Sequence, residues 1–170
     1  MIPAVSFIGQ GGSGKTMLIA RLVPLLRARG HRVGTAKHAP HSATLDLADK
    51  DSFRHRAAGA ERTLVVAESN LALFSERDPE EPLERTIERT FAGCDLVLLE
   101  GFKRGPFPKI EVYCPRGQDA PRPLCWEIEV IAAVTTARDL FPPGTRVLSP
   151  AEPLRIVEFL EQRLLGETRA

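Results

Sequence analysis

The chain has 170 residues, 43% of them hydrophobic, and its 23 Lys and Arg residues offset 22 Asp and Glu residues to a net charge of +1. This length fits about one domain with an ordinary core, and scattered basic residues argue against a nucleic-acid partner. Three cysteines without a C-x-x-C spacing indicate neither a disulfide framework nor a zinc site, and no apolar run approaches the ~20 residues that cross a bilayer. We therefore expect one soluble, cytoplasmic domain over residues 1–170.

The first sixty residues predict the opening of an α/β sheet. The stretch "AVSFI" at 4–8 is typical of a buried strand, and residues 15–30 are apolar at helical spacing up to a closing glycine. "RVGTA" at 32–36 predicts a second strand, so that strand, glycine-rich loop, helix and strand form a βαβ unit. A long polar loop follows, and then a short helix within 50–60.

The rest of the chain predicts a hairpin, further strands and a closing helix. The β-rich runs at 62–68 and 70–76 are separated only by a turn, which favours a hairpin at one sheet edge. "CDLVLLEGF" at 94–102 is almost uninterrupted in apolar residues, as in a central parallel strand covered on both faces. The fold class predicted is α/β, a single domain with a mostly parallel sheet and helices on both faces, and the G-x-x-x-x-G-K-T spacing at 9–16 makes it a P-loop NTPase domain. The remaining expected elements are a helix at 83–92, strands at 109–113, 129–136 and 146–150, and an amphipathic helix at 151–166.

A phosphate-binding loop is predicted at Gly9 to Thr16, which has the spacing G-x-x-x-x-G-K-T between a strand and a helix. Glycines in such a loop let successive backbone N–H groups turn onto phosphate oxygens, while the helix directs its positive end at them. Lys15 is expected to reach the β- and γ-phosphates and Thr16 to place its hydroxyl on Mg²⁺. The predicted nucleotide-binding residues of this segment are Gly11, Gly12, Ser13, Gly14, Lys15, Thr16 and Met17.

A metal-binding carboxylate is expected at the end of a second apolar strand. Glu100 closes the run at 94–102 and is the candidate, acting on the metal directly or through water. We assign Lys15 and Glu100 to catalysis, and Thr16, Glu100 and Asp51 to the metal. A surface-exposed Glu100 at the strand end is the alternative.

The polar segment at 35–60 is a third candidate region, because it opens at the carboxyl end of the second strand, where α/β sheets bind ligands. It contains, besides Asp51, the residues Lys37, His38, His41, Asp46 and Asp49. We expect a loop whose Lys and Asp side chains meet phosphates and Mg²⁺, with Lys37 in contact with the nucleotide. A zinc site and a purely solvated loop are the alternatives.

The base of the nucleotide would be read by a loop after a late strand. A guanine reader offers a carboxylate from an N/T-K-x-D loop after a late strand, and here the comparable place reads Thr136-Ala137-Arg138-Asp139. Asp139 is in position to read guanine, although the stacking lysine is absent. A turn cap is the alternative role for Asp139.

Three stretches in order resemble the MobB family, the molybdopterin-guanine dinucleotide biosynthesis adaptor proteins. They are "GGSGKT" at 11–16, "KHAPH" with "KDSFRHRAAGA" within 37–60, and "DLVLLEGFKRGPFPKIEV" at 95–112. Asp49 departs from the family, which often has glycine before the Lys-Asp-Ser triplet. The resemblance implies a homodimeric protein that binds GTP and Mg²⁺, hydrolyses GTP weakly, and partners the nucleotidyltransferase that joins GMP to molybdopterin. Molybdopterin itself is a further candidate ligand.

Two other functions remain open. A small ATP-dependent kinase or ligase uses the same type of loop, and a structural partner could carry a relic of it. The sequence fixes no arginine finger and no water-orienting glutamine, so we expect slow hydrolysis unless a partner supplies one.

Overall fold

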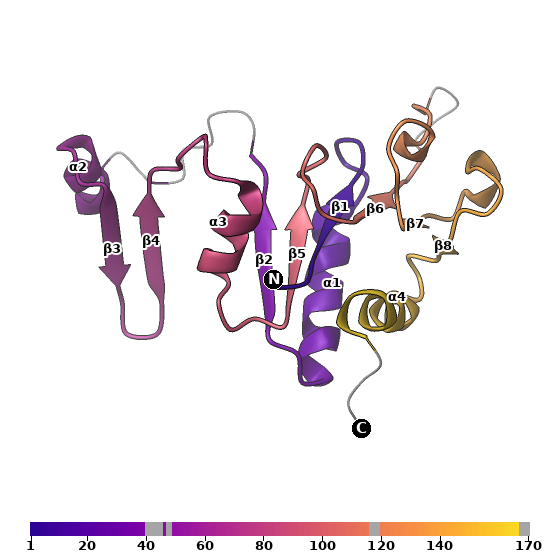
Figure 1. Cartoon of the computed structure of the whole chain (residues 1–170), viewed down its shortest axis with the longest axis horizontal. Coiled ribbons are helices and arrows are strands. Elements are labelled where there is room, and N and C mark those ends of the chain that lie inside the picture. Colours follow the sequence, from indigo (N-terminus) through magenta and orange to yellow (C-terminus); the bar gives the residue numbers. More distant parts are fainter. Residues whose placement is uncertain (40–45, 47–48, 116–119, 167–170) are drawn as a thin grey trace. The chain divides into compact units, whose positions relative to one another are not determined.

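The computed structural model describes residues 1–39, 46, 49–115 and 120–166, which form two compact units. The larger unit combines Met1–His38 with Leu83–Ala170, and the smaller consists of Ala39–Pro82. The smaller unit is thus an insertion in the larger one, between its second strand and its second helix. Figure 1 labels the elements of both.

The larger unit is built on a six-stranded parallel sheet in the order β2-β5-β1-β6-β7-β8. This order confirms the predicted mostly parallel α/β sheet and puts the strand before the glycine-rich loop next to the strand that ends in Glu100. Because all six strands run the same way, their carboxyl ends share one edge. The strands are β1 (Ala4–Ile8), β2 (Val33–Lys37), β5 (Leu96–Glu100), β6 (Lys109–Val112), β7 (Ala132–Val134) and β8 (Val147–Leu148).

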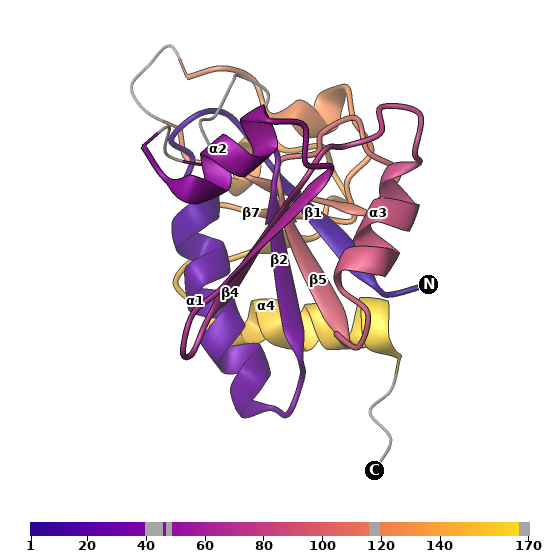
Figure 2. The same cartoon turned by 90° about the vertical axis from the view of Figure 1, so that its left-hand side faces the viewer.

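Helices cover both faces of this sheet (Figure 2). Helices α1 (Lys15–Ala28) and α4 (Pro153–Leu160) pack together on one face, and α3 (Leu83–Thr90) packs on the other. Strand β5 explains the arrangement, because alternate side chains of a strand point to opposite faces. Leu96 and Leu98 join the core beneath α1 and α4, while Val97 and Leu99 join the core beneath α3. All four side chains are fully buried, as the apolar run predicts.

The smaller unit contains helix α2 (Asp51–Ala57) and the strands β3 (Arg62–Val66) and β4 (Leu71–Ser75). The two strands pair in antiparallel register, which confirms the predicted hairpin. They form a two-stranded sheet of their own and do not extend the main sheet. Asp46 is buried in this unit and accepts hydrogen bonds from Ser52 (3.0 Å) and Arg56 (3.5 Å), so its carboxylate has a structural role there.

The predicted boundaries of helices and strands are most accurate where the hydrophobic periodicity of the sequence is strong. Helix α1 starts at Lys15 as expected and continues through Pro24, and α2 lies inside the predicted 50–60 segment. Strand β7 has three residues where eight were expected, because residues 129–131 before it and 135–136 after it are irregular chain. The closing helix is regular to Leu160 and then widens into a π-helical turn at Glu161–Leu165. No helix in the described ranges is both long and apolar enough to span a membrane.

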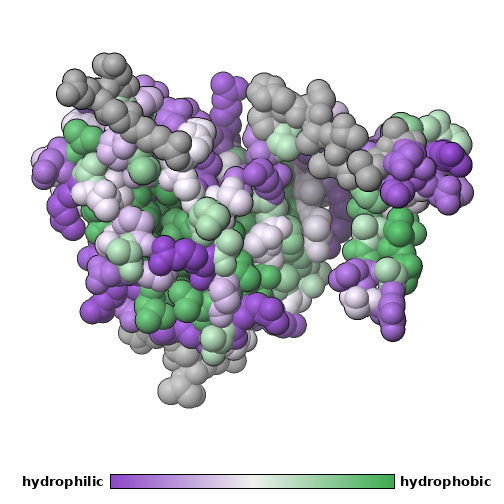
Figure 3. Space-filling view, turned by 180° about the vertical axis from the view of Figure 1, so that it is seen from behind, coloured by the Kyte–Doolittle hydropathy of each residue, from purple (hydrophilic) through white to green (hydrophobic). Residues whose placement is uncertain are grey.

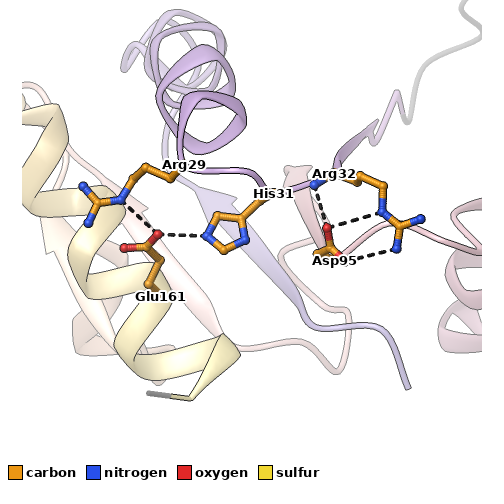
Figure 4. A network of polar contacts seen from close by, with 5 residues as sticks. All are labelled: Arg29, His31, Arg32, Asp95 and Glu161. Atoms are coloured by element: carbon orange, nitrogen blue, oxygen red, sulfur yellow. Dashed lines mark hydrogen bonds and ion pairs between the residues drawn. The ribbon is translucent and has the colours of Figure 1, made fainter. Parts of the chain in front are cut away.

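Two ion-pair groups hold the edge opposite the strand carboxyl ends (Figure 4). Glu161, at the end of α4, accepts hydrogen bonds from the His31 ring (2.8 Å) and the Arg29 guanidinium (3.0 Å). Arg32 and Asp95 form a second, more exposed pair at 3.2 Å. Burial alone would raise the pKa of Glu161, but the hydrogen bonds from His31 and Arg29 outweigh it and hold that pKa below its usual value. The ionised Glu161 therefore ties α4 to the start of β2.

Replacing Glu161 tests this tie. A carboxyl whose pKa is lower in the folded state stabilises the fold above its unfolded pKa, and this stabilisation is lost as the pH falls through the folded pKa. We expect Glu161→Gln to lower the free energy of unfolding at pH 7 by about 1–2 kcal/mol and to flatten its fall below about pH 5.

Glu158→Gln is the matched control, because Glu158 belongs to the exposed pair with Arg155 on the same helix. Urea titrations between pH 3 and pH 7 compare the variants, and the control should lose less than about 0.5 kcal/mol. Equal losses in the two variants would contradict a special role for Glu161.

Candidate functional site

The glycine-rich loop follows β1 and leads directly into α1. Gly9, Gly12 and Gly14 all have positive φ angles, of 150°, 73° and 96°, which L-residues with a side chain rarely adopt. Gly9 also lies against β6, where an added Cβ would collide with the carbonyl oxygen of Val112. The loop therefore needs these glycines both for its turn and for its close approach to the sheet. Because the loop leads from the carboxyl end of β1 into α1, the unpaired N–H groups at the start of α1 lie at the carboxyl edge of the sheet.

Lys15 is held inside this loop. Its ammonium donates hydrogen bonds to the carbonyl oxygens of Gly9 (3.0 Å) and Gln10 (2.8 Å) and to the hydroxyl of Ser13 (3.4 Å). The pKa of Lys15 is lowered, chiefly by burial; the Glu100 charge works against this shift and the Lys37 charge adds to it. Lys15 thus places a positive charge where the loop would hold phosphate oxygens.

Thr16 and Glu100 meet beside this lysine. The Thr16 hydroxyl donates a hydrogen bond of 2.8 Å to Oε1 of Glu100. Glu100 has the same parity along β5 as Leu96 and Leu98, so its side chain points to the face that α1 covers. The Glu100 side chain is 15% exposed, so it is not a freely exposed surface residue. A hydroxyl and a carboxylate at the head of a phosphate loop are the oxygen donors that Mg²⁺ prefers, so the pair fits this metal.

Lys37 completes the group from the neighbouring strand. Lys37 and Glu100 are register partners across the β2–β5 ladder, and the Lys37 ammonium lies 3.0 Å from the same Oε1 that Thr16 contacts. Sequence reasoning predicted Lys37 as a nucleotide contact, but the contact with Glu100 depends on strand order. Four side chains from three elements therefore meet here: Lys15 and Thr16 of α1, Lys37 of β2 and Glu100 of β5.

The chain turns sharply after Glu100. Gly101 and Phe102 both have positive φ angles, of 88° and 52°, and Phe102 is the non-glycine residue with this conformation in the described chain. The His38 backbone N–H donates to the Glu100 carbonyl (2.9 Å), and its ring lies 5.3 Å from that of Phe102. His38 thus packs on the turn that fixes the end of β5.

A pocket of about 210 Å³ adjoins the loop on the side of β6 and β7. Ser13 and Met17 from the predicted loop residues line it, together with Tyr113 and Thr136 at the carboxyl ends of these strands. Asp139 lies on an exposed 3₁₀ turn, Arg138–Leu140, and is not among the residues that line this pocket. The pocket is the place where a nucleoside could extend from the loop, and base reading by Asp139 stays a prediction.

The third predicted metal ligand, Asp51, lies in the smaller unit. Asp51 begins α2 and its carboxylate is 3.6 Å from Arg54, one turn further on. Asp49 is exposed and lies 3.8 Å from Lys50, and His41 falls outside the described residues. Within the described ranges, three or more His, Cys, Asp or Glu side chains nowhere gather in a way that could hold a metal ion. A role for Asp51 at the metal stays a prediction.

Sequence reasoning missed a buried glutamate beside the site. Glu111 of β6 is 1% exposed and accepts hydrogen bonds from the backbone N–H groups of Leu124 (2.6 Å) and Cys125 (2.9 Å). The Tyr113 hydroxyl, just after β6, donates a hydrogen bond to the carbonyl of Pro121 (2.9 Å). Glu111 and Tyr113 therefore both anchor the loop that follows β6. The available signal was a carboxylate between the apolar residues Ile110 and Val112, since a buried carboxylate requires partners.

Most of the chain is similar to proteins of one known family. Residues 4–136 match the family described as "Molybdopterin guanine dinucleotide synthesis protein B", named MobB. The chain belongs to this family. The matched segment includes the loop at Gly9–Thr16, Lys37, the inserted unit and Glu100, so the family resemblance predicted from the sequence is confirmed.

Individual relatives agree with this assignment. The molybdopterin-guanine dinucleotide biosynthesis adapter protein of Escherichia coli is 36% identical over 138 residues, which is 79% of each chain. The crystal structure of Bacillus subtilis MobB has a TM-score of 0.71 at 26% identity and covers 98% of this chain and 100% of its own. A hydrogenase maturation factor from Archaeoglobus fulgidus, HypB, has a TM-score of 0.51 at 17% identity and shares the fold alone. The α/β P-loop NTPase fold predicted from the sequence is confirmed.

Proposed function

We propose that this protein is a GTP-binding adapter of molybdopterin-guanine dinucleotide biosynthesis. In this role it assists the nucleotidyltransferase that attaches GMP to molybdopterin, and it hydrolyses GTP slowly. The relatives named for this pathway support the adapter role. The observation that carries the nucleotide site is the meeting of Lys15, Thr16 and Glu100 at the head of α1.

The chemistry of this group supports a Mg²⁺–triphosphate ligand. Lys15 and the loop N–H groups supply positive charge for the β- and γ-phosphates, while Thr16 and Glu100 supply oxygen ligands. When bound, Mg²⁺ adds positive charge against the charge that develops on the phosphates. The chain's own residues position the phosphates and the metal. Water attack is then slow, because the sequence fixes no group that orients the attacking water.

Calorimetric titration tests the choice of nucleotide. The protein is titrated with GTP, GDP and ATP, with and without Mg²⁺, and then with molybdopterin. We expect GTP with Mg²⁺ to bind most tightly, and co-purification with a nucleotidyltransferase would support the adapter role. Equal affinities for GTP and ATP, together with phosphoryl transfer from ATP to a small acceptor, would favour the alternative, a small kinase or ligase. Absence of all nucleotide binding would favour a structural partner with a relic loop.

We further propose that a second copy of the chain covers the hairpin. The side chains of Leu64, Val66, Leu71 and Leu73 share one face of the β3–β4 sheet and are 56–71% exposed. Figure 3 shows hydrophobic residues gathered on the hairpin surface. An exposed apolar face of this kind marks an interaction site, and the same face on a second copy is self-complementary in a two-fold dimer.

A charge on this face tests the dimer. Leu71→Lys should raise the dissociation constant of a homodimer at least about tenfold, because the dimer would have to bury an unpaired ammonium. Leu154→Lys is the matched control, since Leu154 is also exposed (52%) but lies on α4 of the larger unit. Sedimentation velocity at several concentrations measures both. A monomeric wild type, or a dimer that Leu71→Lys leaves intact, would exclude this interface.

A further inference from the structure

Lys37 has an unusual position for a residue expected to bind a nucleotide. Its ammonium lies 3.0 Å from Oε1 of Glu100, which also accepts the Thr16 hydroxyl at 2.8 Å. The Glu100 carboxylate and the Thr16 hydroxyl both fit a divalent cation. One oxygen of this candidate metal site, Oε1 of Glu100, therefore already faces the positive charge of Lys37. We propose that Lys37 is a tethered cation that neutralises Glu100 in the nucleotide-free protein and keeps divalent cations off this carboxylate until a nucleotide binds.

The strand register explains why the lysine meets this carboxylate. Lys37 and Glu100 end two adjacent parallel strands and are paired in the ladder, so their side chains leave the sheet on the same face. Thr35 and Leu98, one step earlier on that face, are register partners as well. The contact is therefore built into the order β2-β5, and any long cation at position 37 would approach Glu100.

The two partners differ in exposure. The Glu100 side chain is 15% exposed and the Lys37 side chain is 63% exposed. A nearly buried carboxylate has little water to stabilise its charge, so it needs a nearby cation. The lysine side chain is mostly exposed, so water can solvate its ammonium when it leaves Glu100. Lys37 can thus neutralise Glu100 without holding it permanently.

There is room for the lysine to move. An open groove of about 470 Å³ runs beside the pair, between α1 and the edge strand β2. Its lining includes Thr16, Lys37 and Glu100 at one end and the apolar side chains of Ile19 and Val23 further along. Lys37 can therefore swing away from Glu100 without rearranging the backbone.

The charges around Glu100 make the replacement of Lys37 by a metal ion depend on nucleotide binding. Three charged groups gather here: the ammonium groups of Lys15 and Lys37 and the carboxylate of Glu100. Without a nucleotide, a divalent cation near Glu100 would meet two ammonium groups. A triphosphate in the loop offers both lysines an anion, which releases Glu100 for the metal. This step rests on the proposed function, whereas the protection of Glu100 in the nucleotide-free protein does not.

Manganese binding without nucleotide tests the proposal. Mn²⁺ is titrated into the nucleotide-free full-length protein, and free Mn²⁺ is measured by electron paramagnetic resonance. Lys37→Met keeps the length of the side chain and removes its charge, so Mn²⁺ should bind about tenfold more tightly than to the wild type. Lys37→Arg keeps the charge and should bind Mn²⁺ as the wild type does.

A double variant assigns the gain to the carboxylate. Lys37→Met combined with Glu100→Gln should bind Mn²⁺ no better than the wild type. The proposal is overturned if Lys37→Met alone gives no gain, or if the gain persists without the Glu100 charge. Both measurements omit nucleotide, so they stand even if the protein does not bind GTP. Circular dichroism confirms that each variant is folded.

Discussion

Lys15→Ala should reduce the affinity for GTP with Mg²⁺ by at least about 100-fold, which corresponds to about 3 kcal/mol. Lys15 donates to Gly9, Gln10 and Ser13, so its ammonium lies within the loop that would hold the phosphates. Its loss removes charge-assisted hydrogen bonds to the triphosphate that a water molecule does not replace. Calorimetric titration of the variant with GTP and Mg²⁺ measures the effect.

Loop integrity must be separated from phosphate binding in this variant. Removal of Lys15 also deletes three contacts within the loop, which costs about 1–2 kcal/mol of stability. Arg27→Ala is the matched control, because Arg27 is an exposed cation in the last turn of the same helix. Its affinity for GTP should stay within about twofold of the wild type. Retention of GTP affinity in a folded Lys15→Ala protein would refute the assignment of the loop.

Glu100→Gln should remove most of the dependence of GTP binding on Mg²⁺. The wild-type affinity should rise steeply with Mg²⁺, whereas the variant should lose about 30-fold at saturating Mg²⁺, roughly 2 kcal/mol. Without Mg²⁺, the variant should bind GTP as well as the wild type or better, because a negative charge near the phosphates is gone. Glutamine keeps the size of the side chain and can still accept the Thr16 hydroxyl, so the fold should be retained.

Glu129→Gln controls for the loss of one negative charge, since Glu129 is exposed in the same unit outside the candidate site. Titrations of both variants at several Mg²⁺ concentrations separate the two effects. An unchanged Mg²⁺ response in Glu100→Gln would show that the metal, if bound, uses other ligands.

The chemistry of the loop could be predicted from the sequence because it depends on local spacing. Glycines at fixed intervals between a strand and a helix determine the turn, and Lys15 and Thr16 follow at the helix start. Glu100 could also be predicted, because a buried parallel strand that ends in a carboxylate brings it to the carboxyl edge of the sheet. Both inferences need only neighbouring residues.

The contacts that depend on strand order could not be predicted in the same way. Lys37 meets Glu100 because β2 is the neighbour of β5, and no local pattern specifies which strands are adjacent. The hairpin is another case: alternation and a short turn predict the pairing of its strands, but not that they form a separate sheet. Glu111 was overlooked because its partners, the N–H groups of Leu124 and Cys125, lie beyond a long loop.

A crystal structure with a non-hydrolysable GTP analogue and Mg²⁺ would show whether the loop at Gly9–Thr16 is the nucleotide site. We expect the β- and γ-phosphates within this loop, with Lys15 on the phosphates and the Thr16 hydroxyl on the metal. We also expect Lys37 to have moved away from Glu100, from which its ammonium is 3.0 Å in the present structure. Triphosphate density outside the loop, or an empty loop at saturating analogue, would rule out this nucleotide site.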